Sequence, residues 1–152
     1  MAGLDHDFFL LDRAEHPFTA YGDFAGSSGA IQIHDDLVQY MTDALRWIPS
    51  LNPARKRRGF GLNIHGPTII TDAGAPIARR IFESWERLFS SSPPMLRLTG
   101  AWCETVGSPG TGRYLKLTYR RDDAVTRLRG LASLCRRVER GGGQRYLLHM
   151  GI

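Results

Sequence analysis

The chain has 152 residues, of which 42% are hydrophobic and 23% charged, and its formal net charge is +5. This composition excludes a disordered or fibrous chain, and the apolar runs are far shorter than the roughly 20 residues that a membrane-spanning helix needs. Two cysteines give no basis for a disulfide framework or a cysteine-rich zinc site. We expect one domain over residues 1–152, in the cytoplasm, because the first residues, MAGLDHDFFLLDRAEH, contain no basic leader or small-residue cleavage site.

The predicted helices have apolar side chains every three or four residues, as Ile77, Ile81 and Trp85 do, whereas the predicted strands are short apolar or alternating runs. Pro49 and the glycines at 141–143 each end a helical pattern. In chain order the predicted elements are strands at 8–11 and 18–24, a helix at 37–48, strands at 60–64 and 68–71, a helix at 77–89, strands at 95–103 and 114–119, a helix at 125–138 and a strand at 145–150.

Turn-forming sequences join two pairs of these strands. HGP separates the strand at 60–64 from that at 68–71, and ETVGSPGTGR separates Cys103 from Tyr114, so we expect two hairpins. Strands joined in this way are antiparallel, which places the helices on one face of the sheet. The predicted fold class is therefore α+β, a single domain with a mainly antiparallel sheet and three helices packed on it.

Residues 54–66, ARKRRGFGLNIHG, allow two interpretations. A basic run followed by Gly-Phe-Gly is how the RNA-contacting strand of an RNA-recognition motif begins. Such a strand displays two aromatic side chains, however, and here Phe60 would share its face with Leu62 and Ile64, as in a strand packed on the core. We therefore expect Phe60 to face the interior. The alternative function is a nucleic-acid-binding module that uses the basic run Arg55, Lys56, Arg57 and Arg58.

No segment has the pattern of a catalytic, metal or cofactor site, and we expect a protein that is not an enzyme and has none of these groups. GSPGTGRY, residues 107–114, lacks the lysine and hydroxyl residue of a phosphate-binding loop and precedes a strand, so it predicts a hairpin loop. The five histidines lack metal-ligand spacing, and no base can be named beside Cys103. The sequence leaves open whether His65 and His149 meet in space.

Charge is distributed unevenly along the chain. Residues 1–53 contain eight acids and two bases, a balance of −6, and residues 54–152 contain 18 bases and seven acids, a balance of +11. This asymmetry predicts a dipolar surface that attracts charged partners. In the alternative, strands from the two halves interleave and mix the charges.

Five segments carry a family resemblance: ALRWIPSLNP, GFGLNIHGPTII, IFESWERLF, LRLTGAW and the closing LLHMGI. Over roughly residues 37–152 the chain resembles a family of small bacterial proteins associated with the immunity genes of polymorphic and contact-dependent growth-inhibition toxin systems. The resemblance implies a cytoplasmic immunity protein that binds and neutralises the C-terminal domain of a cognate bacterial toxin, and it implies no catalytic residues.

The surface that would meet the toxin depends on the chemistry of the toxin. A nuclease holds phosphates in a basic cleft, so its inhibitor gains affinity and speed by presenting acids to that cleft. In that case the partner is a nuclease domain, and the acidic N-terminal third supplies the expected contacts, which are Asp12, Asp23, Asp35, Asp36 and Asp43. A toxin with an acidic surface would instead meet the basic half of the chain. We expect no membrane partner.

Overall fold

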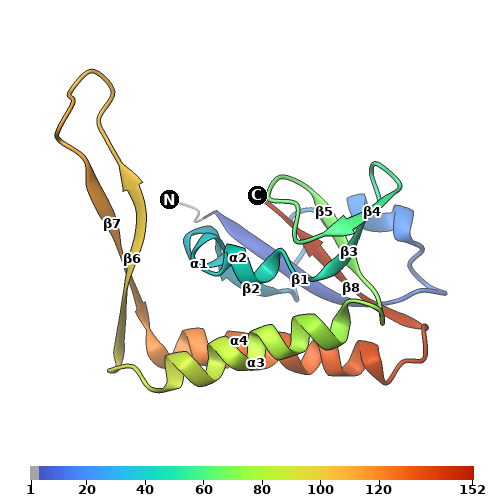
Figure 1. Cartoon of the computed structure of the whole chain (residues 1–152). Helices are drawn as coiled ribbons and strands as arrows, with labels where there is room; N and C mark the ends of the chain where they lie inside the picture. Colours follow the sequence, from blue (N-terminus) through green and yellow to red (C-terminus); the bar gives the residue numbers. More distant parts are fainter. Residues whose placement is uncertain (1–3) are drawn as a thin grey trace.

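The computed structural model describes residues 4–152, which form a six-stranded antiparallel sheet and a separate two-stranded hairpin. Figure 1 shows the helices packed along the main sheet and the hairpin apart from it. The order of strands in the main sheet is β2-β1-β8-β5-β3-β4. Its strands are β1 (Asp5–Asp12), β2 (Ile31–His34), β3 (Pro49–Asn52), β4 (Arg57–Phe60), β5 (Pro67–Ile70) and β8 (Arg145–Met150). The hairpin consists of β6 (Met95–Cys103) and β7 (Arg113–Arg120).

The two faces of the main sheet bury different sets of side chains. The helices α1 (Asp35–Tyr40), α2 (Thr42–Leu45), α3 (Ala75–Ser90) and α4 (Arg121–Glu139) contribute to the larger core, which includes Phe8, Ile70 and Leu147 of the sheet. The other face carries Phe9, Ile69 and Leu148, and the 3-10 helix η1 (Phe18–Phe24) packs against it. Successive residues of a strand point to opposite faces, so each of these strands serves both cores. The predicted α+β class is confirmed.

The long helices α3 and α4 lie side by side under the sheet in Figure 1. The predicted apolar stripe of α4 is buried, including Leu128, Leu131 and Cys135. Arg79 of α3 links the helices, since its Nε donates to Glu139 of α4 at 2.7 Å. The pKa of Arg79 is raised by this hydrogen bond and by the charge of the carboxylate, against the opposing effect of burial.

Two predicted elements have a different local structure. Residues 18–24 were predicted to be a strand but form η1, because Phe18, Tyr21 and Phe24 recur every third residue and all lie against the smaller core. The predicted helix at 37–48 is divided into α1 and α2 at Met41, so four α-helices and η1 occur in residues 4–152 where three helices were expected. The apolar period survives this break, since Leu37, Met41, Leu45 and Ile48 are all buried.

The prediction for residues 60–64 is wrong. The strand β4 ends at Phe60, and the chain turns at Gly61, whose φ of 82° is one that side-chain-bearing residues rarely adopt. Phe60 is therefore 74% exposed, while Leu62 beyond the turn packs against the larger core. The predicted hairpin with 68–71 does not form, because β5 pairs with β3 and β8 instead. The hairpin predicted across residues 103–114 is confirmed by β6 and β7.

Gly74, at the start of α3, lies against the first residue of β3. A Cβ atom at this position would be 2.1 Å from the carbonyl oxygen of Pro49. We expect Gly74→Ala to lower the free energy of unfolding by about 1–3 kcal/mol, measured by urea denaturation, because backbone must shift to admit the methyl group. Gly66→Ala is the matched control, since no atom lies within 4 Å of its Cβ position. Equal stability of the two variants would contradict this contact.

Candidate functional site, an arginine-lined groove

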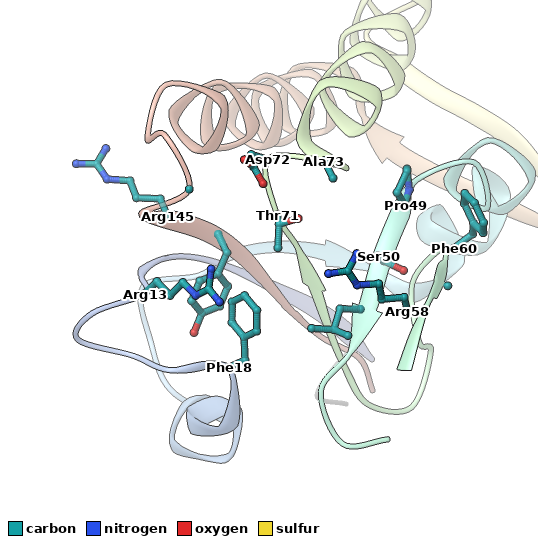
Figure 2. A pocket seen from close by; sticks show the side chains of 14 residues that line it. Arg13, Phe18, Pro49, Ser50, Arg58, Phe60, Thr71, Asp72, Ala73 and Arg145 are labelled. Carbon is teal, nitrogen blue, oxygen red and sulfur yellow. The ribbon is translucent and has the colours of Figure 1, made fainter. Parts of the chain in front are cut away.

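A groove with a volume of about 650 Å³ lies between η1 and the β3–β4 hairpin, on the sheet face opposite the long helices. This volume lies within the range of typical ligand pockets. Figure 2 shows Arg13 and Phe18 on one side of the groove, Arg58 on the other and Asp72 at one end. The lining residues are Arg13, Phe18, Pro49, Ser50, Leu51, Arg58, Gly59, Phe60, Thr71, Asp72, Ala73, Gly143, Arg145 and Tyr146. We call this site the arginine groove.

One wall of the arginine groove is fixed by Tyr146 of β8. The hydroxyl of Tyr146 donates to the carbonyl of His16 at 2.8 Å, and its ring packs edge-on against Phe18 at 4.9 Å. Burial raises the pKa of Tyr146 to about 12, so this hydroxyl stays protonated and acts as a donor. The guanidinium carbon of Arg13 lies 4.7 Å from the centre of the Phe18 ring, in a cation–π arrangement. Phe18 therefore holds Arg13 at the groove.

The opposite wall is β4, which forms one edge of the sheet. Arg58 and Phe60 are two residues apart and so point to the same face, where their paired residues on β3 are Leu51 and Pro49. Leu51 belongs to the smaller core, which identifies this face as the groove side. The guanidinium of Arg58 points toward Arg13 in Figure 2. Phe60 thus adds an exposed aromatic ring beside a cation.

The arginine groove has an excess of positive charge, with three arginines against the single carboxylate of Asp72. Across residues 4–152, no carboxylate oxygen lies within 4.0 Å of a guanidinium nitrogen of Arg13, Arg58 or Arg145. Arginine remains protonated at every ordinary pH and presents a planar set of donors that matches a carboxylate or a phosphate. The groove can therefore bind an anion next to an aromatic surface.

The predicted basic run lies next to the arginine groove. Arg55 and Lys56 are in the β3–β4 turn and Arg57 is on β4, all of them exposed. The amide of Arg55 donates to the side chain of Asn52 at 3.1 Å, which shapes this turn. The sequence prediction named Arg58 but missed Arg13 and Arg145, because they join it only when β8 is placed between β1 and β5.

The predicted acidic contacts do not form one surface. Asp12 ends β1 and accepts from the amide of Ala14 at 2.8 Å, whereas Asp36 and Asp43 lie on α1 and α2. Asp23 is exposed on η1. Strands from the two halves of the chain do interleave, since Asp12 is paired with Arg145 across β1 and β8. The predicted segregation of charge in sequence is therefore not preserved in space.

Asp35 is a correction to the predicted contact set, because it is buried and already has partners. Nε2 of His6 donates a hydrogen bond to Oδ1 of Asp35 at 2.8 Å, and the side-chain amide of Gln39 donates to Oδ2 of Asp35 at 2.5 Å. On the other side of the His6 ring, Nδ1 lies 2.7 Å from Nε2 of His149. A nitrogen–nitrogen contact this short requires one hydrogen between the two rings, since two N–H groups or two bare nitrogens would repel.

This buried polar chain continues from His149 to β5. His149 Nδ1 is 3.3 Å from the hydroxyl of Thr68, which also accepts from the amide of Asn63 at 2.8 Å. His6, His149 and Thr68 are completely buried, and every fully buried side-chain nitrogen or oxygen of residues 4–152 has a hydrogen-bond partner. His149 therefore meets His6 rather than His65. The signal in the sequence was a histidine within each of two apolar strands, β1 and β8.

We expect the protein to lose stability below about pH 6.5 because of His149. Burial, and then the charge of the neighbouring His6, hold the pKa of His149 well below its usual 6.5. The unfolded chain then binds a proton that the folded chain does not, so stability is full above 6.5 and falls by up to about 1.4 kcal/mol for each pH unit below it, until the folded pKa is reached. Urea midpoints between about pH 5 and 7.5 measure this.

His149→Gln is the control for this pH dependence, because glutamine does not titrate there. The variant is expected to have a flatter dependence of urea midpoint on pH, whatever its stability at neutral pH. Parallel pH profiles for the two proteins would contradict the assignment to His149.

Comparison with known protein families, with curated protein sequences and with solved structures gave no match to this chain. Of the helices in residues 4–152, none is long and apolar enough to cross a membrane. The part of the chain that the structure describes contains no group of three or more His, Cys, Asp or Glu side chains placed to hold a metal ion.

Proposed function

We propose that this protein is a cytoplasmic immunity protein that binds and neutralises the C-terminal domain of a cognate toxin of the contact-dependent growth-inhibition type. It acts as a binding protein rather than an enzyme. The resemblance of its sequence segments to immunity proteins supports this role. The sequence-based case for this role assumed a buried Phe60, and the exposed ring contradicts that assumption. The observation that carries the proposal is instead the exposure of Phe60 beside Arg58 at the arginine groove.

Exposed aromatic and arginine side chains are the residue types enriched at the energetic centres of protein interfaces. Burying Phe60 fully in a complex would contribute about 1.5–3 kcal/mol, and Arg13 and Arg58 beside it would pair with carboxylates of the partner. The favoured partner surface is therefore an apolar spot with acidic neighbours. The charges of the two surfaces are then opposite to those expected for a nuclease toxin, where acids of the inhibitor contact bases of the toxin cleft.

The proposal predicts that a large secreted-toxin gene lies directly upstream of this gene, and co-expression with the C-terminal domain of that toxin tests it. We expect the pair to purify together with nanomolar affinity, and we expect Arg13→Ser/Arg58→Ser to weaken the complex. Arg46→Ser/Arg87→Ser removes the same charge from exposed positions outside the groove and is the matched control. A toxin domain that stays active and does not co-purify would overturn the proposal.

A second candidate function is a nucleic-acid-binding module that uses Arg55, Lys56, Arg57 and Arg58. The exposure of Phe60 directly after this run favours it, because an aromatic ring beside cations can stack on a base. This function predicts binding that falls steeply with salt and weakens when the four residues are changed to serine. Absence of binding to RNA and DNA at low salt would remove this candidate.

A further inference from the structure

The β6–β7 hairpin projects from the body of the molecule as an arm, away from the β3–β4 hairpin that borders the arginine groove (Figure 1). Its base packs on the larger core through Leu96, Leu98 and Tyr119. The rest of the arm extends beyond that core, and its connecting loop lies at the far tip in Figure 1. An isolated two-stranded hairpin is only marginally stable in water, so the packing of its base on the larger core stabilises the arm.

Strand register places polar and aromatic side chains on the face of the arm opposite Leu96 and Leu98. Residues paired across an antiparallel ladder share a face, and beyond the pair Met95 with Arg120 at the base this face carries three pairs, Arg97 with Thr118, Thr99 with Lys116, and Trp102 with Tyr114. A register shift between Thr99 and Trp102 adds one residue to β6, which keeps Trp102 on the same face as Thr99. We call these six side chains the arm face.

The two aromatic rings of the arm face are held in place and open to solvent. Trp102 and Tyr114 are 55% and 58% exposed, and their rings meet edge-to-face with centroids 5.0 Å apart. Gly112 lies directly against the indole, since a Cβ atom there would be 2.1 Å from a ring carbon of Trp102. Gly112 therefore makes room for this ring position, and any side chain at 112 would displace the indole.

The arm is strongly basic. Residues 95–120 contain four bases, Arg97, Arg113, Lys116 and Arg120, against one acid, Glu104, which gives a balance of +3. Glu104 lies in the connecting loop and accepts from the amide of Gly110 at 2.7 Å. Considering residues 4–152, no carboxylate lies within 4.0 Å of the cationic group of Arg97 or Lys116. The arm face therefore has two cations without ion-pair partners beside two exposed rings.

We propose that the arm face binds single-stranded nucleic acid, with bases stacked on Trp102 and Tyr114 and phosphates bound by Arg97 and Lys116. Non-specific binders of single strands combine aromatic stacking platforms with cations that follow the backbone. Same-face residues along a strand recur about every 6.8 Å, so cations and rings form rows that a single strand can follow. This goes beyond the proposed function and uses a different surface.

An acidic protein segment is the other partner that positive charge could attract. Protein interfaces are built around an apolar centre, however, and the side chains that accompany the rings and the cations on the arm face are the hydroxyls of Thr99 and Thr118. The two rings form one cross-strand pair and the cations lie in the next two pairs, so a base stacked on the rings would place neighbouring phosphates of the same strand beside the cations. The chemistry of the arm face therefore favours nucleic acid.

Fluorescence anisotropy with fluorescein-labelled oligothymidylate and oligouridylate of about 12 nucleotides tests this proposal on the full chain. We expect binding at about 50 mM salt that Trp102→Ala weakens about 5-fold to 150-fold, the effect of losing one stacked base. Trp47→Ala, which removes an exposed indole from the body, is the matched control and should have no effect. Far-UV circular dichroism should be unchanged for both variants.

The contribution of the two cations, Arg97 and Lys116, is measured by the salt dependence of binding. Arg97→Ser/Lys116→Ser should lower the slope of log affinity against log salt concentration by about 1.4, since each phosphate contact to a single strand contributes about 0.7. Gly112→Ala should weaken binding although it removes no contacting group, because it displaces Trp102.

Three results would overturn the proposal. One is no binding of either oligonucleotide at low salt. Another is binding that is insensitive to Trp102→Ala but lost when Arg55, Lys56, Arg57 and Arg58 become serine, which would assign nucleic acid to the β3–β4 hairpin. The third is equal competition by poly-glutamate, which would assign the arm face to acidic proteins. Loss of oligonucleotide binding leaves toxin binding at the arginine groove intact, so failures of the two proposals are distinguishable.

Discussion

Asp35→Ala is expected to lower the free energy of unfolding by about 1–3 kcal/mol. The substitution removes the acceptor for His6 Nε2 at 2.8 Å and leaves this fully buried ring nitrogen without a partner, whereas the amide of the exposed Gln39 can bind water instead. Leaving a buried polar group unsatisfied costs about 1–3 kcal/mol. Urea denaturation at pH 7.5 measures the change.

Asp43→Ala is the matched control for Asp35→Ala. The side chain of Asp43 is 94% exposed, and its contact with Arg46 is long, at 3.8 Å, so the expected change is within about 0.5 kcal/mol. The two acids were predicted from sequence to have the same role, at a partner surface. Similar stabilities of the two variants would mean that the buried polar chain contributes nothing to the fold.

Phe60→Ala is expected to weaken binding of the cognate toxin domain by about 30-fold or more while leaving the stability of the free protein unchanged. A central aromatic anchor of an interface typically costs about 2 kcal/mol or more when truncated. Phe60 is 74% exposed in the free chain, so the same truncation removes little buried area from the fold. Isothermal titration calorimetry measures the affinity, and thermal denaturation measures the stability.

Leu88→Ala controls for the loss of an exposed apolar side chain. Leu88 is 61% exposed on α3, on the opposite side of the sheet from the arginine groove. We expect it to leave toxin binding unchanged. If Phe60→Ala and Leu88→Ala bind the toxin equally well, the interface does not include the arginine groove.

Local patterns were enough to predict most of the regular elements. The apolar stripe of α4 and the short apolar run of β8 depend only on neighbours within a few residues, and both describe the observed burial, which in β8 is continuous from Tyr146 to His149. Three strands were missed. In β2 and β3 the segments IQIH and PSLN are four residues long and mix polar with apolar side chains, and in β4 the segment RRGF was assigned to a basic loop up to Gly59. Residues 18–24 were predicted to be a strand, whose side chains alternate every two residues, but their aromatic side chains recur every third residue, as in the 3-10 helix η1.

The candidate sites were harder to predict, because each joins segments that are far apart in the chain. The arginine groove takes Arg13 from the end of β1, Arg58 from β4 and Arg145 from β8. The buried polar chain likewise takes its members from β1, α1, β5 and β8. A sequence pattern carries no information about which strands become neighbours, and a register shift of one residue would move every one of these side chains to the other face.

The sequence by itself determined the α+β class, the two long amphipathic helices and the basic character of the segment from Arg55 to Arg58, because these follow from local periodicity and composition. Tertiary structure alone decided that Phe60 is exposed, that Asp35 is buried against His6, and that three distant arginines line one groove. The physical reason is that strand order, register and the turn at Gly61 determine which face each side chain occupies, and these depend on contacts between segments that are remote in sequence.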